Sequence, residues 1–304
     1  MFSYTKTVFK EFSADNIFKY SASLAYYTVF SIAPFVIILT TLSGFFFGKE
    51  AMQGEIYDQL NSLLGSNAAM QIQETIKNIH VAGNNFFASV IGIVVLLIGA
   101  TSIFGEIQDS INKIWGLRVK PKKIWWQLII TRLLSFSLIL SIGFIMAVSL
   151  ILNALVSAFG KFIGQYIQEY SVYFIQITDV ILSFLIANVL FSLMFKILPD
   201  AKIKWKDVLF GGFITAIFFT LGKFAIGFYL GQSNFSSLYG AAGSIIIFMV
   251  WVYYSSIILY LGAEFTKVHA KLYGGKILPK EYAEWIKTEE KPVSSPQLKN
   301  EDLS

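Results

Sequence analysis

Two long apolar runs joined by a short uncharged connection constrain the fold of this chain more than any other feature. They lie between Val208 and Thr266, and the sequence GQSNFSS separates them. Each run exceeds the ~18 residues that a helix needs to cross a hydrocarbon core of ~30 Å. The pattern therefore predicts an antiparallel hairpin of two membrane-spanning helices.

A single cation, Lys223, interrupts the first of these runs. Small residues recur around it at helical spacing: Gly212, Ala216, Thr220, Gly227 and Gly231. Membrane helices approach one another through small faces, and an unpaired ammonium facing lipid is costly. We expect Lys223 to point into the helix bundle, with the three glycines serving as packing or hinge positions. The Gly227-x-x-x-Gly231 spacing also permits a homo-oligomer, although packing within the chain is favoured.

The composition places the chain among multipass membrane proteins. Apolar residues make up 55% and charged residues 14% of 304 residues, against ~45–50% and ~25% in soluble domains. The absence of cysteine excludes disulfides, zinc–thiolate sites and thiol catalysis, and two histidines exclude a histidine-rich metal centre. We expect no metal and no cofactor. The net charge of +5 reports membrane orientation, so no nucleic-acid partner is expected.

Further apolar runs bring the expected number of membrane-spanning helices to about six. The predicted class is therefore an all-α polytopic membrane protein. A six-helix membrane domain covers 23–266, preceded by an interfacial amino-terminal helix at 1–22 and followed by a cytoplasmic tail at 267–304, disordered from about 292. Residues 48–85 are predicted to form a helical cap between the first two spans.

Basic residues are distributed unevenly between the two sides of this arrangement. The amino terminus, the second-to-third and fourth-to-fifth connections and the tail hold nearly all of them, whereas the other side has only Lys49, Lys77 and Lys161. The positive-inside rule then places both termini in the cytoplasm. In the fourth-to-fifth connection Lys202, Lys204, Trp205 and Lys206 are expected to rest on anionic lipid headgroups.

Polar residues inside the predicted spans mark a candidate substrate pathway. In the first span Ser23, Tyr27, Ser31 and Pro34 share one face, and Pro34 should kink the helix. This hydroxyl stripe suits a cavity wall, but ordinary hydrogen bonding between helices is the favoured alternative. Asn153 adds a polar position in the third span.

Asp179 in the fourth span is the expected partner of Lys223. Both residues lie seven to eight positions, or ~10 Å, inside the outer ends of consecutive helices. A pair at matched depth lowers the cost of both charges.

Other charges near span ends have simpler interpretations. Glu106 and Asp109 are favoured as a solvated ion-pair cluster over an acid/base pair. For Glu264, a solvated or Lys267-associated role is favoured over ion coupling.

Catalytic motifs are absent from the sequence. It contains no Walker loop, no Gly-rich phosphate turn after a strand, no metal-binding helix with paired histidines and no nucleophile elbow. We therefore expect a protein that is not an enzyme.

Four segments of the sequence resemble the YihY/BrkB family of bacterial inner-membrane proteins. They are SASLAYYTVFSIAP, FGEIQDSINKIW, LPDAKIKWKDVLFGG and the run from GK through YLG and YGAAGS to WVYYSSIILYLGAEFT. The resemblance covers about Ser13 to Thr266, and it departs at Phe210, where many members carry proline. It implies six transmembrane helices and a bacterial cytoplasmic membrane. Members have been labelled virulence factors and ribonuclease BN; the ribonuclease label conflicts with the residues here, which lack positioned carboxylates or histidines in an aqueous cleft.

Two functions from different classes fit these observations. The favoured one is a transporter or flippase-like protein for an anionic or amphipathic envelope molecule, with Lys223 in the polar pathway. The alternative is a non-transporting scaffold that binds lipid or a partner, in which Lys223 and Asp179 form a structural pair. Family analogy contributes to this preference.

Overall fold

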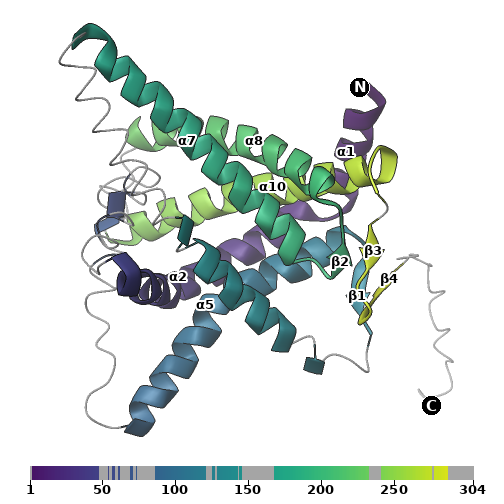
Figure 1. Cartoon of the computed structure of the whole chain (residues 1–304), viewed down its shortest axis with the longest axis horizontal. Coiled ribbons are helices and arrows are strands. Elements are labelled where there is room, and N and C mark those ends of the chain that lie inside the picture. Colours follow the sequence, from purple (N-terminus) through teal and green to yellow (C-terminus); the bar gives the residue numbers. More distant parts are fainter. Residues whose placement is uncertain are drawn as a thin grey trace, which may run out of the picture.

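The computed structural model describes residues 2–47, 86–120, 125–126, 129–142, 144–145, 168–232, 241–275 and 277–286, with isolated positions between 54 and 73. Long helices account for most of these residues (Figure 1). They are α1 (Phe2–Ala14), α2 (Ile17–Phe47), α5 (Phe86–Ile114), α7 (Gln168–Ile197), α8 (Trp205–Gln232) and α10 (Ala241–Leu272). An unlabelled apolar helix covers Ile129–Ile142.

Three segments of the described chain are long and apolar enough to cross a membrane: Val180–Ile197, Trp205–Ile226 and Ile245–Leu272. The expectation of a helical membrane protein is therefore confirmed. Of the six spans that the sequence predicts, these three segments meet the length and apolarity of a span. The helices α2, α5 and Ile129–Ile142 are also apolar. Most of the predicted cap at 48–85 and the tail beyond 286 lie outside the described residues.

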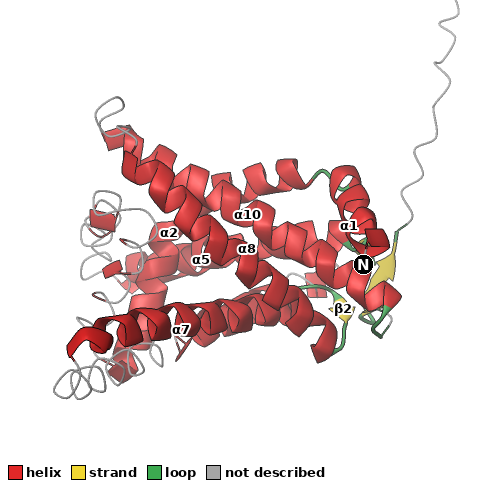
Figure 2. Ribbon diagram, turned by 90° about the horizontal axis from the view of Figure 1, so that it is seen from above, coloured by secondary structure: helices red, strands yellow, loops and turns green. Residues whose placement is uncertain are grey.

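Helix α10 is the central element of the bundle. It packs against α2 on one side and α8 on another, while α7 pairs with α8 and α2 pairs with α5 (Figures 1 and 2). The connection 198–204 turns the chain back between α7 and α8, so these two helices form a hairpin. Apolar side chains on the outer faces, among them Val180 and Leu221, are exposed, as lipid-facing positions are in a membrane protein.

The described core is concentrated at one end of the bundle, which we call the basic end. It contains the carboxyl ends of α5, α7 and α10 and the amino ends of α2 and α8. Trp115, Phe195 and Tyr260 are among its fully buried side chains. On the right of Figure 2 this end is covered by α1 and the strands.

Two short antiparallel strand pairs tie the connections of the basic end together. Strand β1 (Leu117–Val119) pairs with β4 (Ala283–Trp285), and β2 (Ala201–Lys202) pairs with β3 (Leu278–Pro279). The segment 277–286 thus bridges the chain after α5 and the α7–α8 connection. The all-α expectation missed these strands, and α10 extends to Leu272 where the sequence places the end of the last span near Phe265.

Two left-handed backbone positions separate the helices of the basic end. Gly116 has φ +69° immediately after α5, and a residue without a Cβ adopts this conformation at little cost. Asn16, with φ +50°, separates α1 from α2. The single amino-terminal helix expected at 1–22 is therefore two elements, and α2 already begins at Ile17.

Candidate functional site

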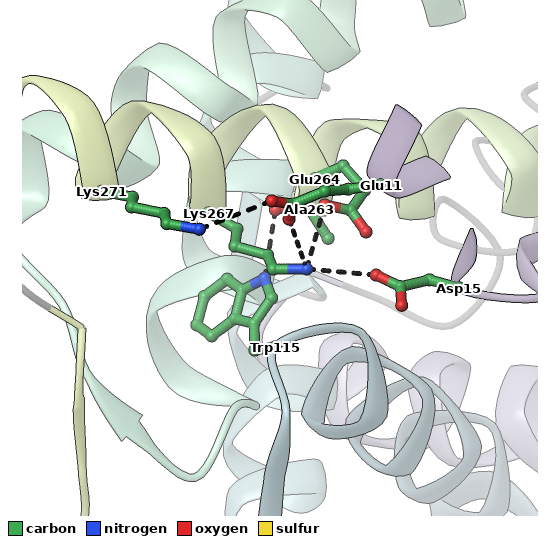
Figure 3. Close-up of polar contacts among 7 residues, drawn as sticks. All are labelled: Glu11, Asp15, Trp115, Ala263, Glu264, Lys267 and Lys271. Carbon is green, nitrogen blue, oxygen red and sulfur yellow. Dashed lines mark hydrogen bonds and ion pairs between the residues drawn. The ribbon is translucent and has the colours of Figure 1, made fainter. Parts of the chain in front are cut away.

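The most charged buried region of the described chain lies where α1 crosses α10 at the basic end. It consists of Glu11 and Asp15 from α1 and its carboxyl end, and Glu264, Lys267 and Lys271 from α10 (Figure 3). We call these five residues the Lys267 cluster.

The Lys267 ammonium is the centre of this cluster. Its Nζ lies 2.7 Å from Glu11 Oε2 and 3.1 Å from Asp15 Oδ2, to which it donates a hydrogen bond. One turn back on the same helix, Glu264 Oε2 lies 3.4 Å away. Lys271 reaches Glu11 Oε1 at 3.6 Å from the exposed rim. The cluster therefore joins α1 to α10 electrostatically.

Glu264 differs from the other carboxylates of the cluster in its burial. Its side chain is 0% exposed, against 23% for Glu11 and 28% for Asp15. Neither of its carboxyl oxygens accepts a hydrogen bond from a described group. The expectation of a solvated Glu264 is wrong, and the expected association with Lys267 is observed. A buried carboxylate that has one cation at 3.4 Å and no hydrogen-bond donor is unusual and calls for a physical explanation.

Apolar and aromatic contacts hold α1 in place over this charge. Tyr4 donates a hydrogen bond of 2.9 Å to the Phe265 carbonyl oxygen, and Tyr4 and Val8 pack with Phe265 and Val268. The sequence predicts a helix at the lipid interface here. Phe9 of α1 is exposed, and the side of α1 that docks on α10 carries Tyr4 and Val8. Burial raises the pKa of the Tyr4 hydroxyl, which keeps it a donor.

Trp115 closes the cluster from the side of α5. Its side chain is 2% exposed, and Nε1 donates a hydrogen bond of 3.1 Å to the Ala263 carbonyl oxygen, next to Glu264 (Figure 3). A buried tryptophan needs such an acceptor for its N–H group. This bond positions the end of α5 against the turn of α10 that carries Glu264.

A second buried carboxylate, Asp200, connects three separate segments of the basic end. Its Oδ1 accepts a hydrogen bond from Gln108 Nε2 at 2.9 Å and its Oδ2 accepts one from Asn112 Nδ2 at 2.8 Å. Tyr282 adds a hydroxyl donor at 3.2 Å, and the Lys280 backbone N–H donates to the Asp200 carbonyl. Three side-chain donors satisfy the Asp200 carboxylate and tie its surroundings together, whereas the buried Oε1 of Gln108 has no hydrogen-bond partner among the described residues.

Two titratable groups beside Asp200, Tyr282 and Lys280, have pKa values shifted by burial. Burial raises the pKa of the Tyr282 hydroxyl, and the negative charge of Asp200 raises it further. Burial lowers the pKa of the Lys280 ammonium by more than Asp200 raises it. Both shifts follow from removing a charged form from water.

Asp207, at the start of α8, is a third buried carboxylate. Its Oδ1 lies 3.0 Å from Nδ1 of His269, and its Oδ2 accepts a hydrogen bond of 3.3 Å from the Gly275 backbone. A Cβ at Gly274 would overlap the Asp207 carboxylate, so this turn requires glycine. The His269 ring stacks on Phe210, the position at which the family resemblance departs from proline. Asp207 therefore fixes the end of α10 against the start of α8.

Lys223 lies within the candidate span Trp205–Ile226, half-buried, and forms no ion pair or hydrogen bond with a described residue. On the same face of α8, Ala216 is fully buried and Gly212 packs against Ser192 of α7, where an added Cβ would overlap the serine hydroxyl. The described part of this face is therefore turned towards a neighbouring helix.

Several of the other predicted pathway residues cannot be placed. Asn153 lies outside the described residues, as do the side chains of Asp179 and Pro34 and the surroundings of Gly227 and Gly231. The pairing of Lys223 with Asp179 thus stays a prediction. Of the hydroxyl stripe on α2, Ser31 is 4% exposed, Tyr27 is 44% exposed and Ser23 is intermediate. The three side chains do not share one environment.

The predicted headgroup residues lie at the exposed rim of the basic end. Lys202, Lys204 and Lys206 are exposed, and 51% of Trp205 is accessible. The alternating Ala201 and Ile203 are buried.

Among the described residues, no group of three or more histidine, cysteine, aspartate or glutamate side chains is arranged to hold a metal ion. The exposed Asp109 carboxylate pairs with Lys113 one turn away. It therefore lies in the kind of solvated ion pair that the sequence favours.

Sequence reasoning missed Asp200, Asp207 and Trp115 as organising residues. Both aspartates lie in or next to the fourth-to-fifth connection, for which the sequence predicts only contact with lipid headgroups. A usable signal existed: two acidic residues within a lysine-rich connection of a membrane protein are unexpected unless they are paired inside the protein.

Curated bacterial proteins are similar to this chain, and two of the three described next are named membrane proteins. The UPF0761 membrane protein Smlt0865 of Stenotrophomonas maltophilia is 25% identical over 86% of this chain and 59% of its own length, so the chain spans less than two thirds of that relative. A UPF0761 membrane protein of Pseudoalteromonas atlantica is 27% identical over 84% of this chain and 81% of its own length. The ribonuclease-like protein YfkH of Bacillus subtilis is 27% identical over 92% and 98%, respectively.

No solved structure matches the fold. A sequence model of the Virulence factor BrkB family matches residues 8–283, which include every described element from α2 to β3. The resemblance found in the sequence motifs is thereby confirmed, and this multipass membrane protein belongs to the Virulence factor BrkB family.

Proposed function

We propose that the protein moves an anionic amphipathic molecule, a lipid or a lipid-linked precursor of the bacterial envelope, across the membrane. The observation that carries this proposal is Lys223. It is a half-buried cation inside a candidate membrane span and has no counter-ion among the described residues. Ionisable residues within a membrane mark substrate or ion pathways by default.

The basic end supplies a second element of the proposal. Its exposed Lys202, Lys204 and Lys206 would concentrate anionic headgroups, at ~1 kcal/mol for each lysine near the surface. Lys223 would then neutralise the headgroup charge inside the membrane, where an unpaired anion is most costly. Substrates with a net negative headgroup are preferred over zwitterionic ones on this basis.

The test is a lipid-translocation assay with the purified protein in liposomes, using fluorescent phosphatidylglycerol and phosphatidylcholine and a membrane-impermeant quencher. We expect faster movement of the anionic lipid. Lys223→Met should slow it by about tenfold or more, since a bond to a charged group contributes ~1.5–3 kcal/mol, and Lys223→Arg should retain it. Lys19→Met, an exposed lysine at the start of α2 to which the proposal gives no role, is the matched control. Wild-type rates in Lys223→Met would refute the proposal.

The second candidate is a non-transporting scaffold. It is favoured by the Asp200 carboxylate, whose three side-chain donors connect separate segments of the basic end. A scaffold predicts no protein-dependent lipid movement in the same assay, with the folded state of Lys223→Met intact.

A further inference from the structure

We propose that the Lys267 cluster is a proton-binding site that is complete only when α1 is docked on α10. The inference concerns the coupling of α1 to the bundle and does not depend on lipid transport.

The balance of charges is the first argument. Docking brings Glu11 and Asp15 of α1 to Glu264 of α10, so three carboxyl groups meet. The cations that face them are Lys267, which is 20% exposed, and Lys271, which is 67% exposed and reaches only Glu11. Within the buried part of the cluster, carboxyl groups therefore outnumber ammonium groups. Three carboxyl groups face the one buried ammonium of Lys267, so one bound proton halves the excess of two negative charges, and Lys271 at the rim offsets part of the remainder.

The environment of Glu264 identifies where that proton is held. Its side chain is fully buried, and neither oxygen has a hydrogen-bond donor among the described groups. A protonated carboxyl is itself a donor, and the nearby Asp15 carboxylate is positioned to accept. A negative charge as close as that of Asp15 disfavours a second negative charge on the buried Glu264 side chain.

The groups that act on Glu264 come from the elements packed around it. These are Glu11 and Asp15 from α1 and Lys267 from α10. From α5, the neighbouring side chain is Trp115, which does not titrate and which excludes water from the Ala263–Glu264 turn. The proton is thus shared between residues of two helices, and neither helix forms the site alone.

The proposal requires α1 to leave α10 by bending at the connection between α1 and α2. Asn16, in a left-handed conformation, interrupts the helix there, and Phe12 and Phe18 contact each other across it. When α1 leaves α10, Glu264 loses the two acidic neighbours and gains water. Both changes favour release of the proton.

Linkage then determines the direction of the pH effect. Because the docked state binds one proton more than the undocked state, docking strengthens as the pH falls and weakens as it rises. The ratio of docked to undocked protein changes by at most about tenfold for each pH unit.

The experiment uses the full chain, which has no native cysteine, in lipid nanodiscs. Spin labels at Lys6→Cys on α1 and Leu272→Cys on α10, both exposed, report the docked population. Infrared difference spectra report protonated carboxyl groups as the pH is raised. We expect one carboxyl band to disappear together with the docked distance. In Glu264→Gln that band should be missing and the docked distance should persist at high pH, because the amide is neutral.

Two further variants keep the proposal open to refutation. Asp15→Asn removes the partner carboxyl from α1 and should also weaken the pH dependence of docking, even if Glu264→Gln does not fold. Glu284→Gln, an exposed carboxylate of β4 that pairs with Arg118, should behave as wild type. Two results would overturn the proposal. One is an infrared band of a protonated carboxyl group that is still present in Glu264→Gln, and the other is a spin-label distance that does not change with pH in the otherwise wild-type chain.

Discussion

Gly211 on α8 and Thr266 on α10 share one small volume: a Cβ at Gly211 would overlap the Thr266 hydroxyl. The relationship is reciprocal, because a Cβ at Gly262 on α10 would overlap the hydroxyl of Thr215 on α8. Each threonine donates its hydroxyl proton within its own helix, Thr215 to the Gly211 carbonyl at 2.6 Å and Thr266 to the Gly262 carbonyl at 2.8 Å. Two Gly-x-x-x-Thr segments thus pack antiparallel, at the close approach typical of small residues in membrane helices.

Gly211→Ala should destabilise the protein by about 1–3 kcal/mol, because the added methyl group forces α8 and α10 apart. Gly105→Ala is the matched control: Gly105 is also helical, but nothing lies near its hypothetical Cβ, so alanine should raise helix stability slightly. Thermal unfolding of both variants in the same detergent, followed by circular dichroism, measures the difference. Equal melting temperatures would contradict the packing described for this helix pair.

Asp200→Asn should lower the free energy of unfolding by roughly 2 kcal/mol. The new amide N–H₂ group would replace a carboxylate oxygen that accepts hydrogen bonds, so at least one of the donors Gln108, Asn112 and Tyr282 would lose its acceptor. Asp109→Asn is the comparison, because its partner Lys113 and Asp109 itself are both exposed and such pairs contribute ~0–1 kcal/mol. Chemical unfolding of the purified variants reports the two values. If Asp109→Asn proved the more damaging change, the role of Asp200 as a structural centre would be wrong.

Trp115→Phe should cost about 1 kcal/mol from the lost hydrogen bond to the Ala263 carbonyl, which is left buried. Trp205→Phe changes an exposed indole and should have a smaller effect. Melting temperatures in nanodiscs distinguish the two. The same preparations should show whether loosening the Ala263–Glu264 turn shifts the pH at which α1 undocks.

Water access to position 223 is measurable because the chain has no cysteine background. In the transport proposal, Lys223→Cys reacts with a membrane-impermeant thiol reagent. Phe224→Cys, at an exposed apolar position next in sequence, should not react, whereas Lys206→Cys at the basic end should react from that side. Labelling at 206 alone, in folded protein, would favour the scaffold.

Local patterns in the sequence located α7, α8 and α10 correctly, whereas the predicted helix at 1–22 is divided between α1 and α2. Apolar runs of sufficient length specify spans wherever they occur, so α7, α8 and α10 could be located without knowing their neighbours. The small face of α8 was visible for the same reason, and Gly212 does pack against α7.

The basic end could not be predicted, because its contacts join residues that are distant in sequence. Strands β2 and β3 have two residues each, too few to produce a periodic pattern. α1 and Trp115 lie against the turn of α10 that carries the buried Glu264, and nothing near Glu264 in sequence indicates these neighbours. Its solvated interpretation failed on this long-range contact.

The docking of α1 on α10 has a consequence for how the protein is made. Tyr4 and Phe265 are separated by 261 positions, so α1 is synthesised long before α10, and their contacts form only after α10 has been made. During that interval α1 lacks its contacts with α10, and its amphipathic surface can rest on the adjacent membrane. The final arrangement of the basic end is therefore a late event in biogenesis, and slow translation of α10 should prolong the exposure of α1 to proteases.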